Sequence, residues 1–434
     1  MALNSRLQKA SLSYMTRATL AIDIGTVHNR YLAFVLVRNG RALFYKLVPS
    51  SDQRVQGSFT AHAMRRVLDD VLEELAAKGV VINAVVADNA ANMQAIRNTP
   101  AAGDELLQDD EDAQAADEPA DYSELRRAFP ALLRCACHVV QLAVKDIEAV
   151  WEAAFEIAQS AVRAAGIRLT ANDTRWNSKY RVMVKALDLD LSESARREIE
   201  EALKVLEPFA VATDLLQRDS ATTFSALTAF EALEKWFEHL RDACPGSPAG
   251  RALAANYESV REAVEKRAAM LFNGPYLLLA YFAPSTDTGS EEACLVSPYV
   301  KTLLESVGMD HQEWARVETL VVDPSTGPVT IEKYKSHLAK HYRATPVVFK
   351  VVTGILDAAP SEASVERLFS MLKFSFDPWR NRASTGLVNA ALGVAAAYRF
   401  FKPTDGELRA EAAAAAPTPS PSPLRPSRTD RRTV

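Results

Sequence analysis

The sequence predicts a mixed α/β protein, in which a β-sheet core is interrupted by a large all-α insertion and followed by a C-terminal helical segment. Three observations predict this class. Runs of β-forming residues alternate with a helical pattern near the N-terminus, a long Ala-, Leu- and Glu-rich stretch follows, and helical patterns return before the final Ala-, Pro-, Ser- and Arg-rich residues. With 434 residues, 48% of them hydrophobic, the chain is long enough for about two or three domains.

Three short runs of β-forming residues come first. They cover Ala18–Ile24, Tyr31–Val37 and Ala42–Val48, and the gaps between them carry Gly and Asn. Gaps this short favour hairpins, because consecutive strands pair directly when only a turn separates them. The sequence therefore predicts an antiparallel meander.

A helix and a buried strand are expected next. Thr60 opens a stretch with apolar residues on one face, and Gly79 stands where helices commonly end. Val80–Ala87 is a nearly continuous apolar run, which is typical of a central strand buried on both faces, and another helix is expected over Ala90–Ile96. The order β-β-β-α-β-α, with a right-handed crossover, predicts the first half of an RNase H-like mixed sheet.

The rest of the chain is expected to be mostly helical from Tyr122 to about Lys340, with amphipathic patterns over Arg196–Leu216 and Phe224–Leu240. The predicted organisation is a flexible lead-in (1–15), the first part of the core (16–144, with an acidic loop at 98–121), a helical insertion domain (145–343), the C-terminal part of the core with a dimerisation segment (344–402), and a disordered tail (403–434).

Composition limits the classes of function. The net charge of −5 argues against a protein that coats nucleic acid non-specifically, although nine carboxylates lie in the acidic loop and leave room for a local basic groove. The sequence contains no run of about 18 apolar residues, so no membrane span is expected. The N-terminus lacks the pattern of a signal peptide. Four cysteines do not make a disulfide framework in a chain of this length, which favours a reducing compartment.

Two carboxylates follow predicted strands. Asp23 ends the first strand and Asp88 ends the fourth, and these strands are neighbours in an RNase H-like sheet. Converging carboxylates supply the hard oxygen ligands with which two divalent ions can grip a phosphoryl group during in-line transfer. The competing interpretation is structural, because an Asp in either position also caps a turn or a helix.

Four segments resemble motifs of hAT transposases and occur in the same order. They are AVVADNAANM (Ala84–Met93), RCACHVVQLAVKDI (Arg134–Ile147), DTRWNSKYRVM (Asp173–Met183) and SEASVERLFSMLKFSFDPWRNRAS (Ser361–Ser384). The resemblance implies an RNase H-like core, a helical insertion domain and a C-terminal dimerisation region. It also implies an ancestral metal-dependent DNA strand cleavage and transfer.

The resemblance assigns roles to particular residues. Glu366 matches the third catalytic carboxylate, so Asp23, Asp88 and Glu366 are expected to be both the catalytic residues and the ligands of Mg²⁺ or Mn²⁺. On periodicity alone Glu366 would be an ordinary charge on a helix, and Trp176 would be a core residue. The residues expected to bind DNA are Trp176, Arg175, Lys179, Arg380 and Arg382.

Cys135, Cys137 and His138 raise the question of zinc. Three candidate ligands within four residues cannot close a tetrahedral site by themselves, and neither Cys244 nor Cys294 has a partner motif, so no zinc is expected. Cys135 and His138 are expected to be structural residues next to the active site, where His138 would orient a phosphate or a catalytic carboxylate.

The chain departs from the family pattern in several places, one of which is that the usual tryptophan pair ahead of the C-terminal signature is not evident. The first motif is usually D-G-W-T, whereas Asp23–Thr26 is D-I-G-T, and the first cysteine is Cys135, so no N-terminal BED-type zinc finger is expected. These departures suggest a truncated or domesticated copy. The expected partners are a second copy of the chain, in a homodimer or a larger oligomer, and DNA in the ancestral role. Neither a membrane nor a small-molecule substrate is expected, and the location would be nuclear, or cytoplasmic if the copy is domesticated.

Two further functions remain open. One is a non-catalytic dimerising factor that interacts with DNA or protein through the same scaffold. The other is an ATP-binding protein of the actin-like fold, since D-I-G-T resembles the phosphate-binding hairpin of that superfamily. The second such hairpin is missing, because Asn and two Ala residues follow Asp88.

Overall fold

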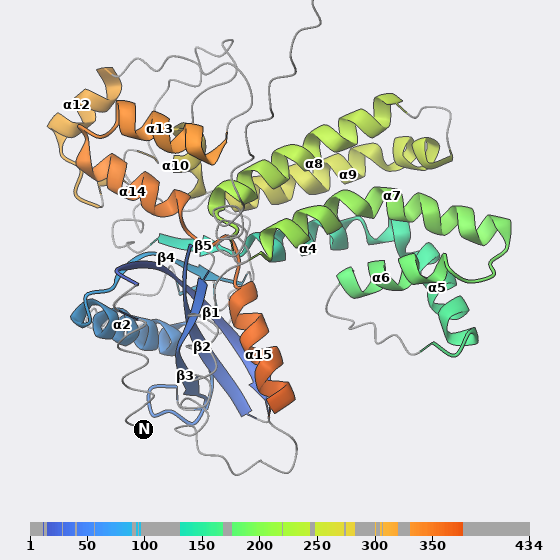
Figure 1. Ribbon diagram of the computed structural model, residues 1–434, viewed down its shortest axis with the longest axis horizontal. Coiled ribbons are helices and arrows are strands. Elements are labelled where there is room, and N and C mark those ends of the chain that lie inside the picture. Colours follow the sequence, from blue (N-terminus) through green and yellow to red (C-terminus); the bar gives the residue numbers. More distant parts are fainter. Residues whose placement is uncertain are drawn as a thin grey trace, which may run out of the picture.

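A mixed β-sheet lies at the centre of the fold, as the computed structural model shows (Figure 1). Its strands are β1 (Arg17–Val27), β2 (Asn29–Arg38), β3 (Arg41–Pro49), β4 (Val81–Ala87) and β5 (Ala131–Arg134), in the order β3-β2-β1-β4-β5. The first three strands pair antiparallel, whereas β4 lies parallel to β1 and β5 lies parallel to β4. The structure describes residues 12, 15–27, 29–39, 41–55, 57–88, 93, 95–96, 131–167, 176–218, 220–243, 248–272, 275–282, 300, 304–305, 307–319 and 330–375.

The antiparallel meander and the buried fourth strand were predicted, and the structure has them at nearly the predicted positions. The fifth strand was not predicted, because Ala131–Arg134 falls in the stretch expected to be helical. Four residues are too few to show a two-residue alternation. The expected helix over Ala90–Ile96, the acidic loop at 98–121 and the tail at 403–434 lie largely or wholly outside the described residues.

The two faces of the sheet are covered by different helices. Helix α2 (Ala61–Ala77) buries its apolar stripe on one face, and it begins where Thr60 Oγ1 accepts a hydrogen bond from the Ala63 amide at 3.2 Å. It ends before Gly79, whose φ of +75° lies in the left-handed region that favours glycine. Helix α15 (Ala363–Ser375) packs its apolar residues on the opposite face, against β1 and β2.

The remaining described helices form one continuous apolar core with β4 and β5. In Figure 1, α4 to α9 extend to one side of the sheet, and α10 to α14 gather above it. These helices are α4 (Ala136–Asp146), α5 (Glu148–Ala164), α6 (Trp176–Ala186), α7 (Glu193–Leu216), α8 (Thr223–Ala243), α9 (Pro248–Phe272), α10 (Tyr276–Tyr281), α12 (His311–Thr319), α13 (Ile331–His341) and α14 (Pro346–Leu356).

A short connector, residues 357–362, joins α14 to α15 and ties several elements together. Its backbone and one of its side chains form hydrogen bonds with β1, with the start of α4, with the end of α7 and with the start of α8. These bonds run from Ala359 N to Thr19 Oγ1 (3.0 Å), from Ala136 N to Pro360 O (2.8 Å), from Ser361 Oγ to Leu216 O (3.0 Å) and from Thr223 N to Ala358 O (2.8 Å).

The described part of the expected dimerisation segment packs inside the chain. Val348, Val352 and Ile355 of α14 are buried in the helical core, and Val365 and Phe369 of α15 are buried on the sheet. Their apolar faces are therefore already covered within one copy. Residues 376–402, the rest of that segment, lie outside the described residues.

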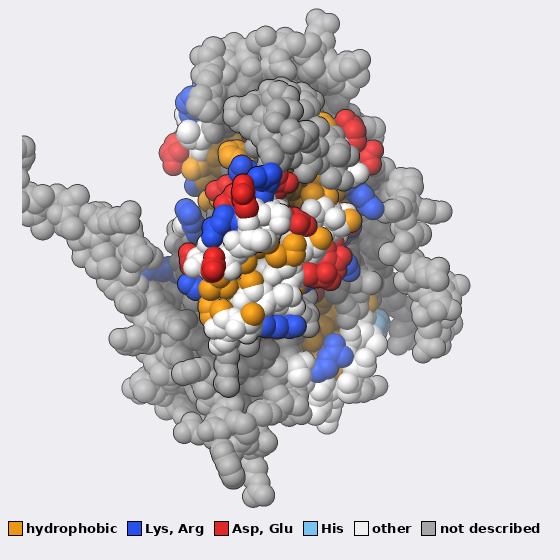
Figure 2. All heavy atoms as spheres, turned by 90° about the vertical axis from the view of Figure 1, so that its right-hand side faces the viewer, with side chains coloured by type: hydrophobic (Ala, Val, Ile, Leu, Met, Phe, Trp, Pro, Cys, Tyr) orange, Lys and Arg blue, Asp and Glu red, His pale blue; other side chains and the backbone are white. Residues whose placement is uncertain are grey.

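The outer surface of the helical region carries mixed charge. Figure 2 shows the face on the right-hand side of Figure 1, where acidic, basic and apolar side chains of the described residues are interspersed and form no single-sign patch. Among the described helices, none has the length and the apolar character required to cross a lipid bilayer.

Candidate functional site

Asp23 and Asp88 lie at the same edge of the sheet. Strands β1 and β4 are adjacent and parallel, as predicted, and Ala21 is paired with Val86. Asp23 and Asp88 each lie two residues beyond that pair. Asp88 follows the end of β4, as predicted, whereas Asp23 lies inside β1, which continues to Val27 in pairing with β2, so the prediction that Asp23 ends its strand was wrong. Carboxyl ends of parallel strands are where ligand sites of α/β sheets form.

Cys135 extends this row of side chains by one strand. It directly follows β5, and its amide donates a hydrogen bond to Ala87 O at 2.8 Å. Asp88 is the residue after Ala87, so the edge of the sheet presents Asp23, Asp88 and Cys135 from three neighbouring strands. The thiol is buried, with 1% of the residue exposed.

Helix α15 brings two more carboxylates to this edge. Glu366 lies in its first turn and Glu362 directly precedes it. The position of the helix is fixed by close packing of Phe369 on β1, since a Cβ atom added to Gly25 would lie 2.5 Å from three atoms of the Phe369 ring. Only glycine lets the ring approach the strand this closely.

The charges of these carboxylates act on one another. The pKa of Asp23 rises from 3.8 to about 8, first because the side chain is buried, and then because the negative charges of Glu362, Asp88 and Glu366 repel its own. A hydrogen bond from the Ile24 amide to Asp23 Oδ1, at 2.6 Å, acts in the opposite direction. Asp88, Glu362 and Glu366 therefore all lie within electrostatic reach of Asp23.

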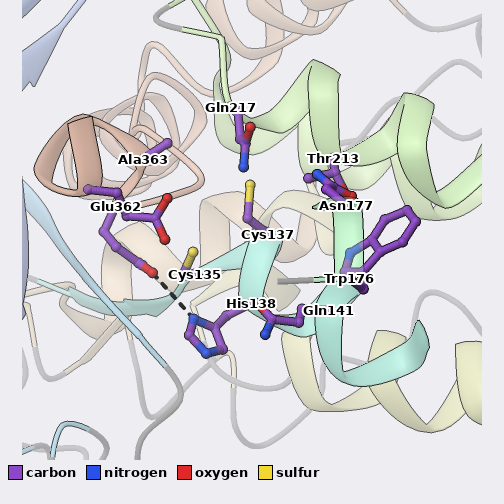
Figure 3. Close-up of a pocket in the computed structure, with 11 residues that line it drawn as sticks. Cys135, Cys137, His138, Gln141, Trp176, Asn177, Thr213, Gln217, Glu362 and Ala363 are labelled. Atoms are coloured by element: carbon purple, nitrogen blue, oxygen red, sulfur yellow. Dashed lines mark hydrogen bonds and ion pairs between the residues drawn. The ribbon is translucent and has the colours of Figure 1, made fainter. Parts of the chain in front are cut away.

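His138 and Glu362 are in direct contact at one side of the pocket (Figure 3). His138 Nδ1 lies 3.4 Å from Glu362 Oε1, and this contact raises the pKa of the imidazole although burial lowers it. Burial raises the pKa of the Cys135 thiol well above its usual range, and hydrogen bonds to Cys137 and Glu362 raise it further. The thiol is thus held protonated, which is unfavourable for a nucleophile.

A small pocket opens beside these groups. Two buried side-chain oxygens that line it, Glu362 Oε2 and Asn177 Oδ1, have no hydrogen-bond partner among the described residues. A buried polar atom without a partner is unfavourable by about 1–3 kcal/mol, so a ligand that satisfies it would bind favourably. The lining residues are Cys135, Cys137, His138, Gln141, Trp176, Asn177, Thr213, Gln217, Glu362, Ala363 and Glu366.

The residues expected to bind DNA are placed differently from one another. Trp176 lines the pocket with 8% of its surface exposed, and its ring packs edge-on against Tyr180 with centroids 6.1 Å apart. Lys179 does not line the pocket, because its ammonium lies 3.1 Å from Glu148 Oε1 and 5.3 Å from the centroid of the Trp151 ring. Arg175, Arg380 and Arg382 lie outside the described residues.

Glu362 is the residue of this site that the sequence analysis did not single out. It lies four positions before Glu366, and two carboxylates at this spacing share a helix face. That spacing was the available signal. The burial of Glu362, which is only 2% exposed, depends on the connector and has no local sequence signature.

The comparisons find neither a matching model of a known protein family nor a match among the curated proteins. The class of protein is therefore described from its fold and from the residues of its site. The chain is a helix-rich mixed α/β protein with a group of carboxylates, a thiol and an imidazole at the carboxyl edge of its parallel strands.

Proposed function

We propose that this chain is a transposase-derived protein of the hAT type, with an RNase H-like core that holds divalent cations for cleavage and transfer of DNA strands. The observation that carries the proposal is the gathering of carboxylates from β1, β4 and α15 around Asp23. The strand order supports it, since a three-stranded meander followed by two parallel strands is the order expected of an RNase H-like sheet.

The donor atoms are of the kind that Mg²⁺ or Mn²⁺ takes. Among the described residues, however, only Cys135, His138 and Glu362 lie close enough together to share an ion, so Asp23, Asp88 and Glu366 would have to move closer to one another when a cation binds. Asp23, Asp88 and Glu366 offer only carboxylate oxygens, which hard divalent cations prefer. Burial, followed by repulsion from Glu362, Asp88 and Glu366, raises the pKa of Asp23 to about 8, and a bound cation would relieve the repulsion. When bound, such a cation would activate an attacking hydroxyl and stabilise the charge of the phosphate undergoing transfer.

In this proposal, the protein's own residues hold the carboxylates in place and contact the DNA substrate. Close packing of Phe369 on Gly25 holds α15, which carries Glu366, beside β1 before any ligand arrives. Trp176 and Asn177 lie across the pocket from Glu362 (Figure 3), and in this proposal they contact a DNA strand that approaches it. Trp176 is only 8% exposed, so its ring would have to become more exposed to stack on a base.

Mn²⁺-dependent nicking of supercoiled plasmid DNA by the purified full-length chain tests the proposal. Asp23→Asn, Asp88→Asn and Glu366→Gln should each lower the rate by about a hundredfold or more, as removal of an electrostatic stabiliser usually does. Asp357→Asn is the matched control, because Asp357 lies in the connector but pairs with Lys335 at 2.8 Å. This variant should nick at the wild-type rate.

Two results would contradict the catalytic proposal. One is the absence of nicking together with no Mn²⁺ binding by calorimetry, and the other is nicking that survives all three substitutions. If the chain does not nick DNA but sediments as a dimer, the result would favour the alternative function of a non-catalytic interaction factor. Whether the chain forms a homodimer, and whether it resides in the nucleus, are parts of the same proposal.

A further inference from the structure

Three side chains from two distant segments form a group with the donor chemistry of a transition-metal site. The Cys135 sulfur, a ring nitrogen of His138 and a carboxylate oxygen of Glu362 all lie within 4.8 Å of one another. Cys135 and His138 belong to one short segment around the start of α4, whereas Glu362 arrives from 224 residues beyond His138. The segment Cys135–His138 has no further candidate ligand close by in the sequence, and the fold brings Glu362 to it.

We propose that Cys135, His138 and Glu362 bind a zinc-class divalent cation, with the fourth coordination position open to the pocket. Thiolate and imidazole prefer a borderline cation such as Zn²⁺ over Mg²⁺, which takes oxygen ligands. The proposed site is therefore chemically distinct from the Asp23, Asp88 and Glu366 set. It does not depend on the proposed function, because zinc binding can be measured whether or not the chain cleaves DNA.

The spacing of the three ligand atoms is close to what zinc requires. Zn–N and Zn–S bonds of about 2.0–2.3 Å place the ligand atoms of a tetrahedral site roughly 3.5 Å apart. His138 Nδ1 and Glu362 Oε1 already lie 3.4 Å apart, and the largest separation in the group is at most 4.8 Å. Side-chain adjustments of about 1 Å would close the site.

Glu362 provides the second, independent indication of a ligand. The residue is 2% exposed, and its Oε2 atom has no hydrogen-bond partner among the described residues although it lines an open pocket. Buried carboxylates are normally paired or bound to a metal. A cation bound by the Glu362 carboxylate would compensate the negative charge that this unpaired oxygen shares, and its binding would release the proton of the Cys135 thiol to solvent.

The surrounding backbone holds the ligands in place before a cation binds. Cys135 N donates to Ala87 O at 2.8 Å, and Ala136 N donates to Pro360 O at 2.8 Å. The second bond joins the start of α4, which carries His138, to the connector that carries Glu362. Sites whose ligands are fixed in this way lose less conformational entropy on binding.

Titration of the metal-free full-length chain with Co²⁺ tests the proposal, since Co²⁺ replaces Zn²⁺ and a Co²⁺–thiolate bond gives a charge-transfer absorption band. About one equivalent should produce the band, excess Mg²⁺ should leave it unchanged, and Zn²⁺ should remove it. Cys135→Ser should abolish the band. Glu362→Gln should retain it and weaken Co²⁺ binding by more than about tenfold.

Cys137→Ser is the matched control. Cys137 lines the same pocket but is not part of the three-ligand group, and in Figure 3 its side chain points toward Gln217, away from the His138–Glu362 pair. Serine can keep the hydrogen bond that Cys137 makes with the Cys135 thiol, so this variant should bind Co²⁺ as the wild type does. No band in the wild type, or a band that is lost in Cys137→Ser and kept in Cys135→Ser, would overturn the proposal.

X-ray absorption spectroscopy of the zinc-loaded wild-type chain is a second test, and it does not depend on whether any variant folds. One sulfur among nitrogen and oxygen neighbours supports the site. A shell of oxygen atoms without sulfur means that zinc binds the carboxylates instead, which would also overturn the proposal.

Discussion

Replacing Asp23 by asparagine should make the folded chain more stable at neutral pH, not less. The pKa of Asp23 is about 8 in the folded chain against 3.8 for an ordinary Asp, so folding favours the protonated carboxyl. The stability associated with this group is complete below pH 3.8 and is lost as the pH rises to about 8. Asparagine cannot ionise, and its side-chain oxygen can still accept the Ile24 amide.

The magnitude follows from the same two values. Each pH unit above 3.8 costs about 1.4 kcal/mol, so at pH 7 the native state has lost at most about 4 kcal/mol. Asp23→Asn should recover most of this free energy of unfolding. The gain should disappear near pH 4, where both chains carry a neutral side chain at this position.

Urea unfolding followed by circular dichroism, with EDTA present and at about pH 4, 7 and 9, measures the effect. Asp188→Asn is the control, because Asp188 is exposed and Lys185 lowers its pKa instead of raising it, so this change should not increase the stability at pH 7 or 9. Stability curves of wild type and Asp23→Asn that run parallel across this pH range would refute the reasoning. Added Mn²⁺ should stabilise the wild type more than the variant if Asp23 is a ligand.

Two further predictions concern packing and capping. Gly25→Ala should destabilise the fold by about 1–3 kcal/mol, because the new methyl group would lie 2.5 Å from the Phe369 ring. In a double-mutant cycle this loss should nearly vanish in a Phe369→Ala background, whereas an equal loss in both backgrounds would rule out the clash. Glu313→Ala should cost about 2–3 kcal/mol, because Glu313 Oε1 accepts the amides of Val347 at 2.8 Å and of Val348 at 3.1 Å at the start of α14. Glu313→Gln keeps an acceptor and should cost clearly less in thermal melts; equal losses would show that the hydrogen bonds contribute little.

The sheet could be predicted from the sequence where the pattern is local. The meander, α2 with Thr60 and Gly79 at its ends, and β4 each occupy a continuous segment whose periodicity or capping residues determine the element. The adjacency of Asp23 and Asp88 followed from the expected pairing of their strands, although β1 continues past Asp23 to Val27 because it also pairs with β2.

Features that depend on distant contacts could not be predicted in this way. Glu362 becomes part of the site only because the connector binds the start of α4, which no local pattern shows. Lys179 is three positions after Trp176 and was expected to contact DNA, yet Glu148 of α5 binds its ammonium. The sequence reveals which charges are present, whereas the fold decides which of them meet.

The connector at residues 357–362 has a consequence for synthesis of the chain on the ribosome. His138 and Glu362 are separated by 224 residues, and chains grow at about 5–20 residues per second, so on the order of 10–45 s pass between them. Throughout that interval the thiol, the imidazole and the strand-end carboxylates lack the groups that complete the pocket. The nascent protein is therefore expected to remain without a finished site until nearly all of its helices have emerged.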